Sequence, residues 1–317
     1  MEIDTNNRLI VIGGPTASGK SACALDVAKE FDGVVINADS MQVYDVLNVL
    51  TARPSNDDLA QAPHALYGVL PPSEACSAGR WQDMAVSAVK DAWAQGKLPV
   101  VCGGTGLYIR TLIEGIGAFP GVPDEIRERA MARLEELGNQ AFHQEVDQRD
   151  PVIAERLHPS DSQRLIRAWE IFEATGKPLS QWQAEVRPEP PLPGLKSATI
   201  VLLPDRADLY PACEARFDLM LELGALDEIR QLDAMNLSPD LPAMKALGVP
   251  EMLSYIRGEK SLEEARDWAK TTTRRFAKRQ MTWFRNQVEP DLLVSAQYSK
   301  RFTDEIFSFI RQFLLTP

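Results

Sequence analysis

The first third of the chain alternates short apolar runs with longer segments of helical periodicity. The apolar runs have the length of buried strands, and each is followed by a polar or glycine-rich turn. The predicted strands are 9–12, 34–36, 67–70 and 98–102, and the predicted helices are 22–31, 78–95 and 107–114. Repeated strand–helix units are typical of an α/β fold with a parallel, doubly wound sheet. Ligand-binding residues of such sheets lie beyond the carboxyl ends of the strands.

The pattern changes after residue 117. A breaker cluster at 119–123 precedes a helical pattern at 124–176, and a second cluster at 188–194 holds four prolines. We therefore expect an α-helical insertion domain at 118–196, within one α/β core formed by 1–117 and 197–317. Strands are expected in this last part at 198–203 and 291–294, and helices at 208–235, 243–255, 262–286 and 301–315.

A phosphate-binding loop connects the first predicted strand to the first predicted helix. Gly14 and the run Gly19-Lys20-Ser21 fit the G-x-x-x-x-G-K-[ST] pattern. Such a loop directs backbone N–H groups at one point, Lys adds a positive charge, and the Ser hydroxyl can hold Mg²⁺. Taken alone, the loop is typical of a P-loop NTPase-like core that binds ATP or GTP. The residues predicted to bind phosphate are Gly14, Pro15, Thr16, Ala17, Ser18, Gly19, Lys20 and Ser21.

Two further turns offer candidate chemistry at the same edge of the sheet. Asp39 follows the second strand, where a carboxylate can act as a general base or hold Mg²⁺ through water. Asp is also common in turns, so a capping role is the alternative. Thr105, in the glycine-rich turn 103–106, can bind a phosphate or cap the following helix.

The distribution of charge along the chain bears on which kind of partner it can bind. The chain carries a net charge of −11, which by itself argues against a polyanionic partner. Residues 268–288, however, contain no acidic side chain, and their basic residues alternate with aromatic ones. This segment predicts either contact with nucleic acid or a solvated basic helix face. Its basic residues are Lys270, Arg274, Arg275, Lys278, Arg279 and Arg285, and a second basic group holds Arg156, Arg164 and Arg167.

Cysteine, histidine and hydropathy exclude several classes of protein. The four cysteines and three histidines are too dispersed for a disulfide framework or a zinc site. We find no secretory signal and no apolar run long enough to span a bilayer. The expectation is a cytoplasmic protein that does not enter a membrane.

Together these motifs resemble one family closely, the bacterial tRNA dimethylallyltransferases, also called tRNA isopentenyltransferases. The resemblance covers residues 9–285 and its motifs occur in the family's order. The matching motifs begin with Gly14-Pro15-Thr16-Ala17-Ser18-Gly19-Lys20-Ser21, Asn37-Ala38-Asp39-Ser40-Met41-Gln42-Val43-Tyr44 and Gly103-Gly104-Thr105-Gly106-Leu107-Tyr108. They continue with His158-Pro159-x-Asp161-x-Gln163-Arg164-Leu165-x-Arg167 and Arg275-x-Ala277-Lys278-Arg279-Gln280-x-Thr282-Trp283-Phe284-Arg285.

The resemblance implies a reaction and a set of roles. The dimethylallyl group of dimethylallyl diphosphate moves to N6 of the adenine at position 37 of tRNA, and diphosphate leaves. The implied catalytic residues are Asp39 as general base, Lys20, Thr105 and Arg216, with Mg²⁺ on Ser21. The implied tRNA contacts are Asp39, Ser40, Met41, Gln42, Thr105, Arg127, Gln163, Arg164, Leu165, Ile166, Arg167, Lys245, Ala246, Leu247, Gly248, Val249 and Pro250.

Other implications concern partners and alternatives. The resemblance implies that a monomer binds the anticodon arm of tRNA, chiefly through the helical insertion. Gly248-Val249-Pro250 departs from the family, which has Gly-Tyr and a basic residue there. The alternative functions are a P-loop small-molecule kinase, an adenylate isopentenyltransferase and a non-catalytic RNA-binding module.

Overall fold

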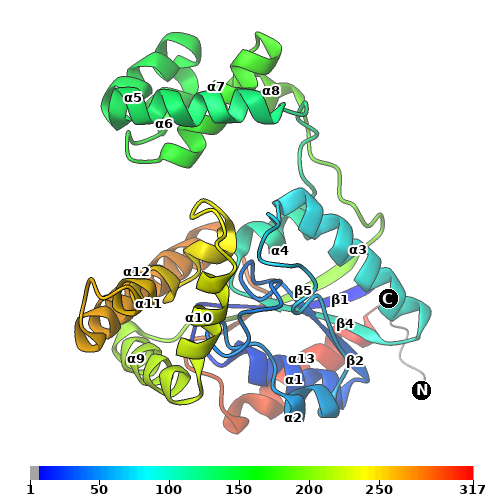
Figure 1. Ribbon diagram of the computed structural model, residues 1–317. Coiled ribbons are helices and arrows are strands. Elements are labelled where there is room, and N and C mark those ends of the chain that lie inside the picture. The colour runs from blue at the N-terminus through cyan, green and yellow to red at the C-terminus, as the bar shows by residue number, and fades with distance from the viewer. Residues whose placement is uncertain (1–6, 317) are drawn as a thin grey trace. The chain divides into compact units, whose positions relative to one another are not determined.

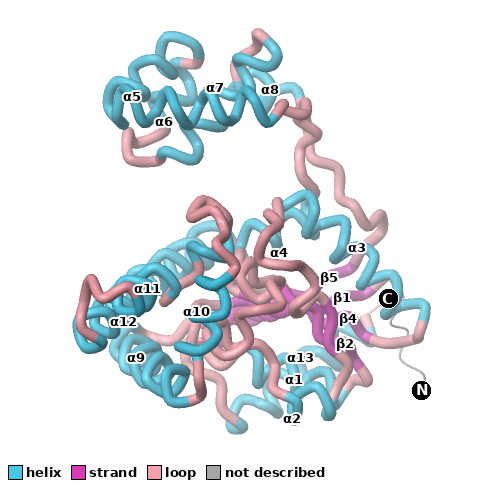
Figure 2. Tube along the Cα trace, in the orientation of Figure 1, coloured by secondary structure: helices cyan, strands magenta, loops and turns pink. Residues whose placement is uncertain are grey.

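The computed structural model describes residues 7–316, and its centre is a six-stranded sheet in the order β3-β2-β4-β1-β5-β6 (Figures 1 and 2). All five neighbouring pairs are parallel, which confirms the predicted α/β fold class. The strands are β1 Arg8–Gly13, β2 Gly33–Asn37, β3 His64–Ala65, β4 Leu98–Gly103, β5 Lys196–Leu202 and β6 Leu292–Val294.

Helices cover both faces of the sheet, so the central strands are apolar on both sides. Every residue of β1, β2 and β4 is buried. One face packs against α1 (Lys20–Glu30) and α13 (Thr303–Leu315), and the other against α3 (Ala78–Ala94) and α4 (Gly106–Glu114). This two-sided burial explains why the strands read as continuous apolar runs rather than as alternating ones.

The third predicted strand is wrong in position. Residues 67–70 form a turn, and β3 is instead the short segment His64–Ala65, which pairs with Val35 and Ile36 of β2. Leu66 and Gly68 have positive φ angles of 65° and 59°, which redirect the chain directly after β3. Leu70 makes only an isolated bridge to Tyr44.

Glycines divide two of the helices predicted in the last third. Segment 208–235 forms α9 (Arg206–Glu222) and α10 (Ala225–Ala234), because Gly224 between them has a φ angle of 99°. Segment 243–255 forms a 3₁₀ turn, η1 (Pro242–Lys245), and α11 (Val249–Ile256), separated by Gly248 with a φ angle of 92°. The last third also contains α12 (Leu262–Gln287) and the 3₁₀ turn η2 (Lys300–Phe302), and the first third contains the short α2 (Asn56–Gln61).

The chain divides into two compact units. One consists of the residues up to Ile113 and from Pro191 onward, and the other is Glu114–Pro190. The second unit contains α5 (Asp124–Arg149), α6 (Pro151–Arg156), α7 (Ser162–Thr175) and α8 (Leu179–Glu185). Its own apolar core includes Phe142, Leu165 and Ile171, each fully buried. Within residues 7–316, no helix combines the length and the apolar character needed to cross a bilayer.

Candidate functional site

The phosphate loop between β1 and α1 has a backbone shape that its small residues permit. Gly19 is the residue before α1 and has a φ angle of 85°. A Cβ atom at Gly14 would lie 2.5 Å from the carbonyl oxygen of Leu202 on β5, so only glycine fits there. Ala17 also has a positive φ, 63°, a conformation that non-glycine residues seldom adopt. The loop therefore curls tightly around the end of β1, as phosphate-binding nests do.

Two side chains and one backbone N–H, all distant in sequence, hold this loop from two directions. From α12, the Oε1 atom of Gln280 accepts a hydrogen bond from the Thr16 N–H at 2.8 Å. From the segment after β6, Tyr298 N donates to the Ser18 carbonyl at 2.9 Å, and Gln297 Nε2 donates to the Ala17 carbonyl at 3.1 Å. None of these three clamping residues was predicted to belong to the site, since no local motif links them to the loop.

Two cations beside the loop have no acidic partner. Lys20 Nζ donates to the Pro15 carbonyl at 3.4 Å, and Arg216 of α9 donates to the Thr16 hydroxyl. Neither cation forms an ion pair among residues 7–316. Burial lowers the pKa of both groups, while Asp39 opposes the shift. Two partly desolvated positive charges without a counterion favour binding of an anion at this loop.

The turns after β2 and β4 are joined by hydrogen bonds of their own. The buried Asn37 accepts from Asp39 N at 2.8 Å, and Asp39 Oδ1 accepts from Met41 N at 2.9 Å. Thr105 Oγ1 accepts from Ser40 N at 3.0 Å. The Thr105 hydroxyl therefore fixes the turn that carries Asp39, and within residues 7–316 it forms no hydrogen bond to the start of α4. These bonds hold the Asp39 carboxylate at the carboxyl end of the sheet.

A cavity of about 240 Å³ brings the predicted groups together. Thr16, Asp39 and Arg216 lie on one wall, so the phosphate loop, the candidate base and one cation face the same space. The remaining lining residues are Ser40, Met41, Leu50, Thr51, Cys213, Phe217, Met220, Lys245, Leu247, Thr273, Phe276 and Arg279. Apolar side chains, two of them aromatic, thus share the lining with polar and charged ones, which suits a ligand that has both an organic and an anionic part.

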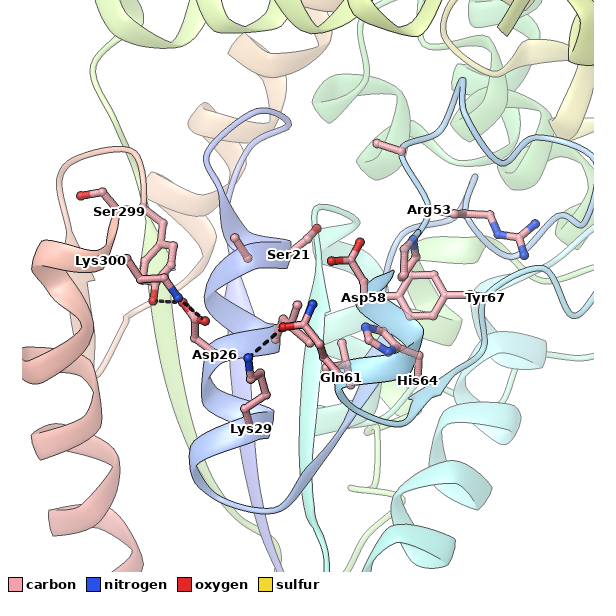
Figure 3. Close-up of a pocket in the computed structure, with 16 residues that line it drawn as sticks. Ser21, Asp26, Lys29, Arg53, Asp58, Gln61, His64, Tyr67, Ser299 and Lys300 are labelled. Atoms are coloured by element: carbon pink, nitrogen blue, oxygen red, sulfur yellow. Dashed lines mark hydrogen bonds and ion pairs between the residues drawn. The ribbon is translucent and has the colours of Figure 1, made fainter. Parts of the chain in front are cut away.

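A larger cavity of about 480 Å³ lies beside α1, where Figure 3 shows Ser21 at its edge. Its polar groups are largely paired with one another: Lys29 donates to Gln61 at 2.8 Å, and Lys300 donates to Asp26 at 2.5 Å. Burial lowers the pKa of His64 in the same wall, which favours the neutral ring at physiological pH. Ser21 at the start of α1 lines this cavity, whereas Thr16 of the phosphate loop lines the smaller one.

The residues present fit a magnesium ion only if a ligand supplies most of its oxygens. Residues 7–316 contain no group of three or more His, Cys, Asp or Glu side chains that could hold a metal. The exposed Ser21 hydroxyl is one hard oxygen donor at the N-terminus of α1. Mg²⁺ commonly takes one or two protein oxygens, together with phosphate oxygens and water. The site is thus compatible with a metal shared with a diphosphate.

The other predicted tRNA contacts of the first unit divide into accessible and buried residues. Met41, Lys245 and Leu247 line the smaller cavity, whereas Gln42 Nε2 donates to the carbonyls of Thr51 and Ala52 at 2.8 and 2.9 Å. The buried residues are Ala246, Gly248 and Val249, and Pro250 is exposed at the start of α11. Burial of Val249 leaves its side chain unavailable for a surface contact.

The basic surface of α12 is smaller than the sequence indicates. Lys270 pairs with Asp218 at 2.7 Å and Arg274 pairs with Glu214, so both charges are balanced within the fold. Arg275, Lys278 and Arg279 are exposed and form no ion pair among the described residues. Together with Arg285, which is also exposed and forms no ion pair among residues 7–316, these side chains are the cationic surface that α12 offers to a partner.

In the second unit, a buried carboxylate organises two of the predicted tRNA contacts. Glu170 of α7 is only 1% exposed and lies 3.6 Å from the Arg127 guanidinium and 3.5 Å from that of Arg167. Gln163 and Arg164 are exposed, while Leu165 is buried in the core of this unit and Ile166 is partly buried. The family motif that begins at His158 extends to Glu170, but the sequence assigned no role to this residue; its i+3 spacing from Arg167 is a signal of such a pair.

Comparison with known protein families gives two matches. The model of the IPP transferase family matches residues 42–287, and the model described as isopentenyl transferase matches residues 7–67. The first match alone spans more than half of the chain.

Individual proteins are similar along nearly the whole length. A tRNA dimethylallyltransferase from Rhodospirillum centenum is 54% identical over 280 residues, covering 88% of this chain and 89% of the relative. The enzyme of that name from Paramagnetospirillum magneticum is 50% identical over 315 residues, covering 98% of each chain.

Solved structures agree. A tRNA isopentenylpyrophosphate transferase from Bacillus halodurans has a TM-score of 0.70 at 33% identity, covering 98% of this chain and 97% of that one. A eukaryotic dimethylallyltransferase described as acting on tRNA has a TM-score of 0.77 at 28% identity, covering 96% of this chain and 80% of that one.

Proposed function

The chain belongs to the IPP transferase family, and we propose from this that it is a tRNA dimethylallyltransferase. It transfers the dimethylallyl group of dimethylallyl diphosphate to N6 of the adenine at position 37 of tRNA and releases diphosphate. The proposed residue roles below rest on the geometry of this chain.

One observation supports these roles more than any other: the unpaired cation Arg216 and the carboxylate Asp39 line the same small cavity as Thr16 of the phosphate loop. Lys20 and Arg216 flank a loop suited to a diphosphate, and Asp39 lines the same cavity as Arg216. A leaving diphosphate gains negative charge, which fixed cations and backbone N–H groups stabilise. A carboxylate near the attacking amine accepts the proton that the amine loses.

The proposed step balances as a single displacement. N6 of adenine forms a bond to C1 of the dimethylallyl group, and the bond from C1 to the diphosphate oxygen breaks with its electron pair going to that oxygen. The proton lost by N6 moves to the Asp39 carboxylate. Lys20, Arg216 and the loop N–H groups hold the departing diphosphate, while Thr105 keeps the Asp39 turn in place.

Magnesium bound through Ser21 would neutralise part of the diphosphate charge and so make it a better leaving group. This role does not require any metal ligand beyond the Ser21 hydroxyl and the ligand's own oxygens. Loss of Mg²⁺ should therefore weaken diphosphate binding more than tRNA binding.

We propose that the target adenine of tRNA flips into the small cavity while basic side chains on the surface contact the tRNA phosphates. The adenine must leave its stack to reach the partly buried Asp39 carboxylate, and Ser40, Met41 and Phe276 line a cavity suited to it. The exposed cations of α12, and Arg127, Gln163 and Arg164 of the second unit, would contact the anticodon arm. A single chain carries all these groups, which supports a monomer acting in the cytoplasm, where tRNA is modified.

A labelling assay tests this function. Purified protein with Mg²⁺, dimethylallyl diphosphate labelled at C1 and unmodified tRNA should produce labelled tRNA, and AMP in place of tRNA should remain unlabelled. Labelled AMP would indicate an adenylate isopentenyltransferase instead. Transfer of phosphate from ATP would indicate a kinase.

A further inference from the structure

Gln280 of α12 joins the two halves of the site through one carboxamide. Its Oε1 accepts from the Thr16 N–H at 2.8 Å, and its Nε2 donates to the Gly104 carbonyl at 2.9 Å. Thr16 N can only donate and the carbonyl can only accept, so these partners fix which end of the amide faces which loop. Gln280 is only 6% exposed. The bonds connect residues 264 and 176 positions apart, so they join parts of the chain that no local turn connects.

The backbone near Gln280 leaves room for this contact only because residue 104 is glycine. A Cβ atom at Gly104 would lie 2.2 Å from Gln280 Nε2, closer than non-bonded atoms approach. The φ angle of Gly104 is not positive, so its backbone conformation does not itself require glycine. Two neighbouring glycines also make room for side chains of α12. A Cβ atom at Gly106 would lie 2.1 Å from Trp283, and one at Gly13 would lie 2.5 Å from Phe284.

We propose that Gln280 is a positioning residue that sets the separation between the phosphate loop and the turn carrying Thr105. The Thr16 hydroxyl also accepts a hydrogen bond from Arg216. The Thr105 hydroxyl accepts one from the N–H of Ser40, the neighbour of Asp39. The diphosphate side and the proton-accepting side of the reaction are therefore held in register by one side chain. This inference rests on the proposed function, because register between the two sides matters only if a group passes from one to the other.

A change in the separation of the two loops should slow the chemical step more than it weakens substrate binding. A misplacement of about 1 Å between reacting groups can lower a rate on the order of 100-fold. The diphosphate keeps Lys20 and Arg216 in any Gln280 variant, and the tRNA keeps its surface contacts. Gln280→Met retains the length of the side chain and removes both hydrogen bonds. We expect kcat to fall by about 10- to 100-fold, while KM for either substrate changes by less than about threefold.

A double-mutant cycle with Gly104 separates positioning from general damage. Gly104→Ala should lower kcat because the new methyl group displaces the Gln280 amide. In a Gln280→Ala background the nearest remaining atom is the Gly14 carbonyl oxygen at 3.3 Å, which a shift of a few tenths of an ångström relieves, so adding Gly104→Ala should cost less than about threefold more. Losses that multiply would contradict the proposal, because they would show that Gly104 does not act through Gln280. Gly79→Ala, where a Cβ would meet nothing closer than 3.9 Å, is the matched control.

Gln280→Glu gives a second readout that a purely structural role would not change. The ionised carboxylate can accept from Thr16 but cannot donate to Gly104, whereas the protonated acid can do both. The ratio of variant to wild-type kcat should therefore rise as pH falls. The other titratable or charged groups around the loop are Lys20, Asp39, Cys102, Cys213 and Arg216, and the ratio cancels them because both enzymes contain them. A ratio independent of pH would contradict the proposal.

The controls keep this inference apart from the proposed function. Wild-type protein that fails to label tRNA would overturn the function itself. Labelling by wild type together with unchanged kcat in Gln280→Met would overturn only the role of Gln280. Thermal unfolding of each variant identifies those that fold, and Gln287→Met on the exposed end of the same helix should behave as wild type.

Discussion

Asp39 is the side chain on which the proposed proton transfer depends. Asp39→Asn keeps the size of the side chain and an oxygen that can accept from Met41 N, but it removes the base. We expect kcat for tRNA prenylation to fall at least about 100-fold, the lower end of general-base contributions. Single-turnover rates with saturating tRNA measure this directly. Asp45→Asn, at an exposed position nearby, should stay within about twofold of wild type. An Asp39→Asn enzyme equally active would remove Asp39 from the mechanism.

Lys20 gives a pH dependence whose direction follows from its surroundings. Burial holds the pKa of Lys20 below its ordinary value of 10.5. A bound diphosphate favours the protonated amine, so affinity is complete below the pKa of the free enzyme and is lost as pH rises above it. Dissociation constants for dimethylallyl diphosphate should therefore begin to increase at a pH below 10.5. An affinity that stays constant through this range would contradict a diphosphate contact by Lys20.

Residues of the site were predictable where their signal was local. The phosphate loop, Asp39 and Thr105 each follow a strand directly, and strand ends meet at one edge of a parallel sheet. Gln280, Gln297 and Tyr298 were not predictable as clamps, because their partners lie on the phosphate loop, far away in sequence. Contacts of this kind depend on tertiary packing, which no window of residues encodes.

At the scale of elements, α12 has a different role on each face. Its buried face carries Gln280, Trp283 and Phe284 against glycines of β1 and the β4–α4 turn. Its exposed face offers Arg275, Lys278 and Arg279. The amphipathic pattern predicted a helix with a basic side, and the structure adds that the opposite side supports the reacting loops. One helix thus touches both the catalytic loops and the surface proposed for tRNA.

The contact between α5 and α7 of the second unit leads to a prediction about the KM for tRNA alone. Glu170→Gln removes the charge that holds the Arg127 and Arg167 guanidinium groups. Because both arginines are proposed tRNA contacts, KM for tRNA should rise several-fold while KM for dimethylallyl diphosphate stays constant. Steady-state kinetics with each substrate varied in turn measures the two constants. Glu155→Gln, at an exposed position on α6, is the control. An equal rise in both constants would point to a general loss of structure.

Helices and strands were predicted correctly where hydrophobic periodicity determines them. They were predicted wrongly where the φ angle of a single residue ends or divides the element. β1, β2 and β4 agree with their apolar runs, whereas 67–70 is a turn, because positive φ angles at Leu66 and Gly68 interrupt it. Gly224 and Gly248 likewise divide helices that the pattern joined. A Cβ at Gly248 would lie 2.9 Å from Leu50, a contact that only the folded structure reveals.

At the scale of the whole molecule, a net charge of −11 has to coexist with binding of a polyanion. Residues 268–288, which include most of α12, contain exposed cations and no acidic residue, so attraction there is local while the total charge is repulsive. The logarithm of kcat/KM for tRNA should fall linearly with the logarithm of salt concentration. Lys278→Gln should make that slope shallower by about 0.7 to 0.9 if it removes one phosphate contact. Lys90→Gln on α3 should leave it unchanged, and an unaltered slope in Lys278→Gln would exclude that contact.

The central claim is that the phosphate loop holds the part of the substrate that departs. Dimethylallyl diphosphate carrying ³H at C1 and ³²P in the β-phosphate tests it most directly, with unmodified tRNA as acceptor. The account predicts that tRNA gains ³H and no ³²P, that diphosphate carrying ³²P appears in equal amount, and that nuclease digestion places all ³H on the adenine at position 37. Transfer of ³²P to tRNA, or release of diphosphate without ³H in tRNA, would contradict the account.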